Sequence, residues 1–327
     1  MNIGFYIKWA KGSLDRKEGN VIGDELLSLS MIKYLHKIPK VHAELYSPNF
    51  PPSAKLDVMI YMNDVPLQSN WARKHVIYIQ NGYASGGDAV LRHLASMGFD
   101  GFILYSSKLL ELHKSSGGEG IYLPFGVDTE LFYPRPIDSA YMFECAYIGN
   151  DIKGKDRTEQ FIMPAVNYNF GLFGNWHLPG IKYQIKQLIG LAKPWDAYQI
   201  RLGKIAKGKI PQEDVPKLYS SAKINLNCTI QDCVDMDVIT LRTFEILACK
   251  GFLITDRVPA AEKILQGCVV FTDGGKDLDD KIKYYLAHSE ERTEIAERGY
   301  QYVVKYATIE ARVNELYAYL TTIAKGR

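Results

Sequence analysis

Short apolar runs alternate with amphipathic helical patterns along the chain, and this alternation limits the possible folds more than any other feature. The runs NIGFYI (2–7), DVMIYM (57–62), HVIYIQ (75–80) and GFILYS (101–106) are rich in β-branched and aromatic residues, which is typical of strands buried on both faces. The runs ECAYIG, NFGLFG, KINLNC, FLITD and CVVFT continue the pattern. Strands that alternate with helices form parallel sheets, so we predict the α/β class.

A segment without periodicity divides this pattern in two. Residues 123–142 carry three prolines, and a fresh strand pattern begins after them. We therefore predict two Rossmann-like domains, at residues 1–135 and 140–305. An amphipathic helix follows within residues 306–327, and we expect it to cross back and brace the N-terminal domain.

Charge and cysteine content exclude several classes of protein. The 327 residues hold 39 Lys and Arg against 37 Asp and Glu, far from the basic excess that phosphate binding along a nucleic acid requires. The five cysteines are odd in number and lack the spacing of a zinc or redox site. No apolar run approaches the roughly 18 residues of a membrane span. These features predict a cytoplasmic protein with reduced thiols.

The stretch TLRTFEILACKG predicts a helix that begins near Thr240 and ends at Gly251. It follows the strand KINLNC and a polar loop, and ligands of doubly wound sheets bind beyond the carboxyl ends of strands. The first N–H groups of this helix, those of Leu241, Arg242 and Thr243, would suit a phosphate.

Two acidic residues, Asp237 and Glu245, stand eight positions apart around the start of this helix. Glu245 could accept hydrogen bonds from ribose hydroxyls, and Asp237 could face a sugar beyond the phosphates. The alternative is a helix pair of Arg242 and Glu245 worth a few tenths of a kcal/mol, with Asp237 solvated, and the spacing alone favours it.

From about Phe143 onward the chain resembles the group 1 glycosyltransferases, and most closely their spore-maturation-protein, CgeB-like branch. The stretches IPQEDVPKLYSSAKINLNC, TLRTFEILACKGFLITD and the segment from CVVFT to IEAR carry the resemblance, and LPFGVDTELFYP resembles the crossover segment. The resemblance implies a GT-B fold, in which two Rossmann-like domains face across a cleft. It also implies a nucleotide-sugar bound mainly to the C-terminal domain, metal-independent catalysis and retention of anomeric configuration.

The resemblance also implies roles for individual residues. Glu245 would hold the nucleotide ribose, and Asp237, where the family usually has Glu, would lie near the donor sugar. In the loop after ECAYIG, the cations Lys153, Lys155 and Arg157 would meet the donor pyrophosphate. Charge on the leaving diphosphate grows as the bond breaks, so cations there stabilise the transition state most. We rank Arg157 and Lys155 ahead of Lys153; the alternative is a solvated basic loop.

Two glycines close strands of the C-terminal half, Gly149 in YIGN and Gly174 in LFGN. Both are candidate donor-binding positions, and Asn175 next to Gly174 could line the base pocket. Packing alone is an equally good reading of the residues that follow Gly174.

The loop of residues 11–27 is the unusual feature of the N-terminal half. Gly19 and Asn20 would let the backbone approach a donor closely, and Asp24 would open the following helix, where carboxylates are favoured. The resemblance implies that this loop faces the donor sugar and acceptor, which makes Asp24 a catalytic candidate. A helix start with acidic dipole partners is the alternative.

A second loop, residues 78–88, follows the strand HVIYIQ and is a candidate acceptor loop. Its candidate acceptor-binding residues are Gln80, Asn81 and Tyr83.

The leading hypothesis is therefore a glycosyltransferase that moves a sugar from a nucleoside-diphosphate sugar to a glycan, surface polymer, protein or modified nucleobase. A nucleotide-sugar epimerase or hydrolase of the same architecture, and a non-catalytic nucleotide-sugar-binding protein, are the alternatives. A balance of 14 Lys and Arg against 13 Asp and Glu over residues 1–135 argues against a DNA acceptor. We predict no cofactor beyond the donor and no metal site; Asp235 and Asp237 are the one candidate carboxylate pair.

Overall fold

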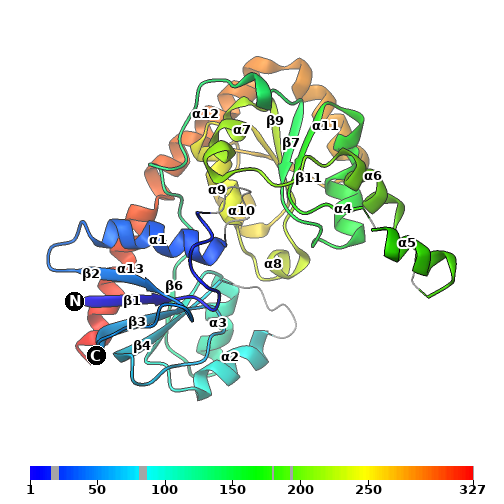
Figure 1. Ribbon diagram of the computed structural model, residues 1–327. Coiled ribbons are helices and arrows are strands. Elements are labelled where there is room, and N and C mark those ends of the chain that lie inside the picture. Colours follow the sequence, from blue (N-terminus) through cyan, green and yellow to red (C-terminus); the bar gives the residue numbers. More distant parts are fainter. Residues whose placement is uncertain (16–21, 81–86, 179, 192–193, 327) are drawn as a thin grey trace.

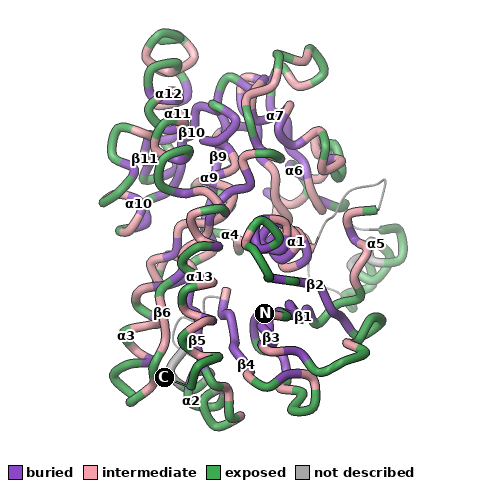
Figure 2. The backbone as a smooth tube through the Cα atoms, turned by 90° about the vertical axis from the view of Figure 1, so that its left-hand side faces the viewer, coloured by how far each residue is buried: buried purple, intermediate pink, exposed green. Residues whose placement is uncertain are grey.

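The protein consists of two parallel β-sheets, each flanked by helices and placed one above the other (Figure 1). The structure is a computed structural model that describes residues 1–15, 22–80, 87–178, 180–191 and 194–326. Most strand residues are buried, whereas the outer helices expose much of their length (Figure 2). The prediction of an α/β fold with two Rossmann-like domains is confirmed.

The N-terminal sheet has the order β2-β1-β3-β4-β5-β6, and all of its pairs are parallel. Its strands are β1 Asn2–Tyr6, β2 His42–Tyr46, β3 Leu56–Met62, β4 Ala72–Ile79, β5 Gly101–Leu104 and β6 Ile121–Tyr122. Its helices are α1 Gly23–Leu35, α2 Gly87–Ser96 and α3 Ser107–Ser115. Residues 58–62 of β3 are all fully buried, which explains why this central strand is apolar on both faces.

The C-terminal sheet has the order β11-β10-β9-β7-β8, again with parallel pairs. Its strands are β7 Cys145–Ile148, β8 Phe170–Phe173, β9 Ile224–Asn227, β10 Leu253–Asp256 and β11 Val270–Thr272. Its helices are α4 Lys155–Phe161, α5 Ile181–Leu188, α6 Ala197–Ile205, α7 Val215–Ser221, α8 Gln231–Asp235, α9 Leu241–Ala248, α10 Pro259–Ile264, α11 Gly275–Ala287 and α12 Ser289–Tyr306. The described part of the domain also contains short 3₁₀ helices at Ser139–Tyr141, Met163–Asn167 and Gln212–Asp214.

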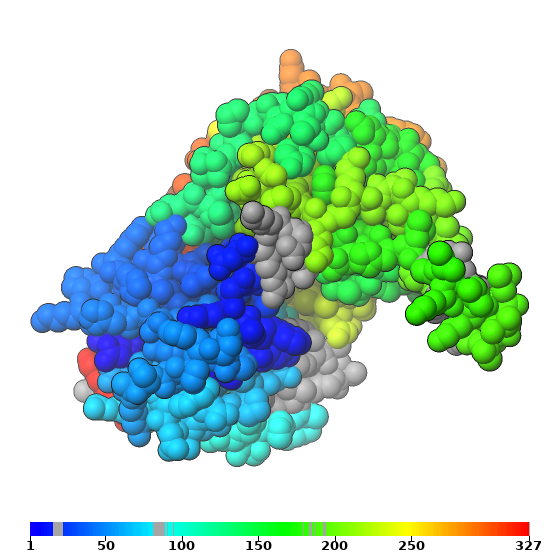
Figure 3. Space-filling model, in the orientation of Figure 1, coloured from blue at the N-terminus to red at the C-terminus, as the bar shows by residue number. Residues whose placement is uncertain are grey.

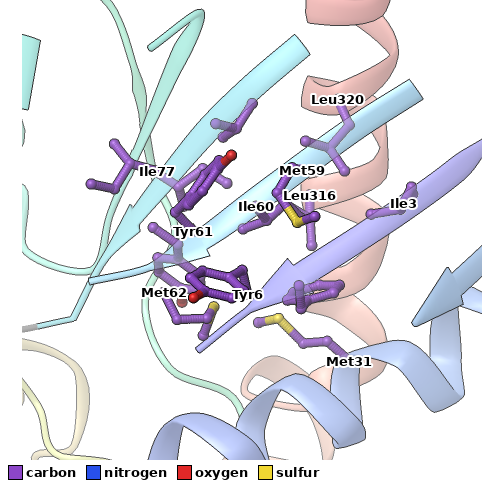
Figure 4. Packing of buried hydrophobic residues seen from close by; sticks show 14 of the residues in the cluster. Ile3, Tyr6, Met31, Met59, Ile60, Tyr61, Met62, Ile77, Leu316 and Leu320 are labelled. Carbon is purple, nitrogen blue, oxygen red and sulfur yellow. The ribbon is translucent and has the colours of Figure 1, made fainter. Parts of the chain in front are cut away.

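The last helix, α13 (Ile309–Ala324), returns to the N-terminal domain and packs against α1, β3 and β4. Its Leu316 and Leu320 are fully buried in the core of that domain, beside Met59 and Ile60 of β3 (Figure 4). The predicted crossing of the C-terminal helix is therefore confirmed. Each fully buried leucine contributes roughly 1.5–3 kcal/mol, which fixes the helix firmly to this domain.

The chain passes between the domains twice, and the two passages lie side by side. Val127 donates its backbone N–H to the carbonyl of Ala307 over 2.9 Å, and Ile309 donates to the carbonyl of Val127, also over 2.9 Å. Thr308 caps α13 by accepting a hydrogen bond from the backbone N–H of Ala311. The outgoing and returning segments thus form one paired connection.

Candidate functional site at the domain interface

Each sheet contains one point where the chain reverses its direction of travel across the strands. In the C-terminal sheet the chain moves from β7 to β8 and then returns to the other side of β7, where β9 lies. In the N-terminal sheet the same reversal separates β1 from β3. Such switch points leave a crevice at the carboxyl ends of the flanking strands, where ligands of doubly wound sheets bind.

A cavity of about 220 Å³ joins the two domains near these crevices. It is lined by Gly23 and Leu26 of α1, by residues 148–150 after β7, by Gly174 after β8, by parts of segment 209–215, and by Arg242. Residues of both domains therefore meet at one cavity, and three of the predicted donor-binding positions, Gly149, Gly174 and Arg242, are on its wall.

A glycine is required at position 174, where the loops after β7 and β8 touch. Gly174 has a φ of 125°, and a Cβ atom there would lie 2.1 Å from the carbonyl oxygen of Gly149. Gly149 donates its N–H to the carbonyl of Phe173 over 2.9 Å. Asn175, which we predicted to line the base pocket, donates its backbone N–H to Oδ1 of Asn150 over 2.9 Å. The wall is thus built from backbone, which can approach a ligand closely.

Two cationic side chains, Arg242 and Lys153, lie at the C-terminal switch point. Arg242, in the first turn of α9, donates from Nη1 to Oδ1 of Asn227 at the end of β9 over 3.2 Å. Burial, and then repulsion from Arg242, lowers the pKa of Lys153 to about 8. Among the described residues, no carboxylate forms an ion pair with Lys153. An anion bound beside the two side chains would relieve this repulsion.

Glu245 lies one turn beyond Arg242 on α9. Burial raises the pKa of Glu245 to about 7, and the Arg242 guanidinium opposes that rise by stabilising the carboxylate. A carboxylate accepts hydrogen bonds only, so Glu245 in its ionised form suits the hydroxyl groups of a ribose. Its role as the ribose ligand stays a prediction.

The first turn of α9 differs from the sequence prediction at one residue. Thr240 is the N-cap residue, in an extended conformation, so Leu241 and Arg242 begin the helix with N–H groups that have no partner within it. Thr243 instead donates its N–H to the carbonyl of Thr240 over 3.1 Å. The prediction of a free N–H at Thr243 is therefore wrong, because the turn closes one residue earlier than expected.

On the N-terminal domain, Asp24 occupies the first turn of α1. Its two carboxylate oxygens accept hydrogen bonds from Nδ2 of Asn63 over 3.1 and 3.2 Å. Asn63 follows β3 with a φ of 62°, and its Oδ1 accepts from the backbone N–H of Gln80 over 2.8 Å. Burial raises the pKa of Asp24. The carboxylate is held in one orientation, and its basicity is increased, next to the cavity residue Gly23.

Comparison with known proteins gives a fold for this arrangement and a family match for part of the chain. Sucrose-phosphate synthase from Thermosynechococcus elongatus is similar over the full length of both chains, with a TM-score of 0.68 and 13% identity. The Anabaena protein HepE, solved with UDP and glucose, has a TM-score of 0.65 and 13% identity over 98% of this chain and 100% of its own. The DNA-modifying enzyme β-glucosyltransferase has a TM-score of 0.64 and 14% identity over 99% and 100%. These likenesses show the GT-B fold.

Residues 157–318 match the family described as glycosyl transferase-like. About half of the chain therefore matches a family of glycosyltransferases. No curated protein sequence matches the chain. The matched residues include Asn227, Arg242 and Glu245 of the C-terminal switch point, whereas Lys153 lies before the match begins. The CgeB-like branch stays a prediction.

Arg157 and Lys155 contact other residues of the C-terminal domain, which the sequence prediction did not include. Arg157 forms an ion pair with the buried Asp256 and donates from Nε to the carbonyl of Thr229 over 2.5 Å. Lys155 is exposed and bonds Oδ1 of Asp196 over 3.1 Å. Their charges are compensated within the domain, whereas Arg242 lines the cavity with Lys153 beside it. These contacts favour Lys153 over Arg157 and Lys155 as a donor contact, and the catalytic roles of all three stay predictions.

The side chain of Asp237 contacts α10, whereas we expected it to lie near the donor sugar. It has a φ of 59°, and its Oδ1 accepts from the backbone N–H of Ala260 in the first turn of α10 over 2.5 Å. The next residue, Val238, packs into the core of the N-terminal domain. Asp237 therefore braces the domain interface in this structure and is not among the residues that line the cavity. Its neighbour Asp235 is exposed and accepts from Gln231.

Four of the predicted site residues, Gly19, Asn20, Asn81 and Tyr83, lie outside the described residues. Of the acceptor candidates Gln80 is described, and its Nε2 atom is buried with no hydrogen-bond partner in the described part of the chain. Sequence reasoning missed Asn63 and Asn227. Both end a buried strand at a switch point, which is the signal that would have identified them.

Two further observations concern the described residues alone. No three His, Cys, Asp or Glu side chains among them gather closely enough to hold a metal ion. None of the helices in the described ranges combines the length and apolar composition of a membrane span.

Proposed function

We propose that the enzyme transfers a sugar from a UDP-sugar to an acceptor held by the N-terminal domain. The observation that carries this proposal is the pair Lys153 and Arg242, two cations at a ligand-binding switch point, with the half-buried carboxyl group of Glu245 one helical turn away. A diphosphate between them would neutralise both charges. HepE has the same fold and is 13% identical to this chain, and its structure was solved in complex with UDP and glucose.

In this proposal the nucleotide lies along the C-terminal wall of the cavity. The base occupies the part lined by Gly149, Gly174 and Ile210, and the ribose bonds Glu245. The diphosphate contacts the N–H groups of Leu241 and Arg242 at the start of α9, where the helix dipole favours an anion. Arg242 and Lys153 then stabilise the charge that grows on the leaving diphosphate.

Asp24 stands on the acceptor side of the cavity. With its raised pKa and its orientation fixed by Asn63, it can take the proton of an acceptor hydroxyl as the new bond forms. The resemblance leads us to expect retention of the anomeric configuration, whereas Asp24 acting as a direct base would lead to inversion. The two mechanisms give opposite anomers of the product. The anomeric coupling in the NMR spectrum of the product distinguishes them.

Truncation of the two cations, against Lys155 from the same loop, tests the assignment. Arg242→Ala and Lys153→Ala should each weaken UDP binding at least tenfold in calorimetry, because charge-assisted hydrogen bonds are worth about 1.5–3 kcal/mol. The rate of transfer should fall further than the affinity. Lys155→Ala should change UDP affinity less than about twofold, since an exposed ion pair contributes little. Equal losses of UDP affinity in Lys155→Ala and Lys153→Ala would instead support Lys155 as a donor contact, as the sequence analysis ranked it.

The proposed chemistry needs no metal ion and no cofactor other than the donor, because the two side chains supply the positive charge. Transfer in excess chelator should therefore proceed at its full rate. Loss of activity that magnesium or manganese restores would instead make Asp235 and Asp237 metal ligands. Rapid donor hydrolysis that no acceptor accelerates would favour the hydrolase alternative. A complete lack of turnover would favour the non-catalytic binding protein.

A further inference from the structure

Residues 178–191 leave the C-terminal domain as a projecting arm built around α5. The arm is a separate green lobe at the lower right of Figure 3, and Figure 1 places α5 beyond α6 at the outer end of the domain. At its root, the buried Trp176 donates from Nε1 to the carbonyl of Gly149 over 2.6 Å. The arm is thus tied to the wall of the donor cavity but extends away from the body of the protein.

The described apolar side chains of the arm are exposed to an unusual degree. Their exposed fractions are 75% for Ile181, 52% for Ile185, 86% for Leu188, 62% for Ile189 and 74% for Leu191. The first four stand at positions i, i+4, i+7 and i+8, which is one face of a helix. Single exposed apolar residues are ordinary, but a contiguous set marks an interaction site.

The charges of the arm indicate what covers this face. Lys182 and Lys186 each follow an apolar residue of the face and are exposed. Residues 178–195 contain a third lysine and no Asp or Glu. Long lysine side chains can bury their stems with the apolar face while their ammonium groups reach phosphate headgroups. Two arms packed together would instead bring like charges near each other.

We propose that this arm attaches the enzyme to the surface of an anionic lipid bilayer. The apolar face of α5 enters the boundary between headgroups and acyl chains, and Lys182 and Lys186 pair with anionic headgroups. With α5 lying in the surface, attachment through Trp176 holds the donor cavity close to the bilayer. The proposal is independent of the transfer reaction.

Vesicle flotation tests the proposal with the full chain, using phosphatidylcholine vesicles with and without phosphatidylglycerol. The wild-type protein should float only with phosphatidylglycerol, and Ile185→Ser combined with Leu188→Ser should reduce the bound fraction at least tenfold. Lys182→Gln combined with Lys186→Gln should reduce binding about tenfold or more at low salt, because each basic residue near an anionic surface contributes about 1 kcal/mol. The matched control is Ile137→Ser, which removes a side chain of 64% exposure outside the arm and should bind as wild type.

Other outcomes overturn the proposal. The proposal is wrong if the wild-type protein floats equally well with uncharged and anionic vesicles. It is also wrong if either double variant floats as well as the wild type. Sedimentation without lipid covers the remaining alternative: a dimer that the Ile185→Ser, Leu188→Ser variant abolishes would identify a second copy of the chain as the partner. Unchanged UDP affinity and circular dichroism in both variants exclude unfolding as the cause.

Discussion

The two switch points share one topology but carry opposite chemistry. At the C-terminal switch point, Asn227 orients a guanidinium, and the ammonium group of Lys153 stands beside it. At the N-terminal one, Asn63 orients a carboxylate instead, that of Asp24. At both switch points an asparagine fixes the charged group, Asn63 directly after β3 and Asn227 at the end of β9.

This difference indicates a division of labour that the fold alone does not determine. A cationic crevice suits the phosphates of a donor, whereas a carboxylate of raised pKa suits removal of a proton from an acceptor. If the two crevices have these separate roles, changes in each should affect different measurements. The following predictions test that separation, from the largest expected effect to the smallest.

Asp24→Asn should abolish proton transfer while it leaves donor binding intact. General acid–base catalysis contributes about 10²–10⁴-fold, so the transfer rate should fall at least about a hundredfold. UDP affinity should stay within about twofold. The matched control is Asp57→Asn, a change of the same kind at the start of β3, far from the switch point along the strand. An unchanged transfer rate in folded Asp24→Asn would remove Asp24 from the mechanism.

Glu245→Ala should have the reverse effect on binding. Loss of one or two hydrogen bonds to the ribose should weaken UDP binding at least about tenfold, as measured by calorimetry. Glu297→Ala, which removes an exposed carboxylate paired with Lys250, is the control and should bind UDP normally. Full nucleotide affinity in folded Glu245→Ala would falsify the ribose assignment.

The pH dependence of UDP binding should report on Lys153. Its pKa of about 8 in the free protein means that it is charged below that pH and loses its proton above it. A bound diphosphate favours the charged form, so binding above that pH takes up a proton and becomes weaker. Affinity should fall about threefold from about pH 7.5 to about pH 8.5. The slope should disappear in Lys153→Met; if it persists there, another group titrates.

The sequence predicted the elements of this site better than their partners. Buried strands appear as continuous apolar runs, so the two sheets and the position of α9 with Glu245 followed from the pattern. The partner of Arg157 is Asp256, 99 residues away, and no local pattern shows which cation such a contact neutralises. The direction of Asp237 depends on a positive φ and on the start of α10, which are properties of the folded chain.

The same limit applies to the arm. The sequence shows a helix with lysines, but the exposure of Ile181 and Leu188 follows only from how far the segment projects from the domain. Apolar periodicity normally predicts a face that the protein buries itself. In this chain the periodic face of α5 is left uncovered by the described residues that pack around it.

The return of α13 has a consequence for synthesis of the protein on the ribosome. The C-terminal domain, from β7 to α12, is one continuous stretch, and its sheet is complete once β11 has been made. The N-terminal sheet is translated before the C-terminal domain, yet the leucines of α13 that complete its core are translated after that domain. The half that is translated first therefore completes its core only after the other half has been made, and until then the surface that α13 covers stays open to non-native contacts.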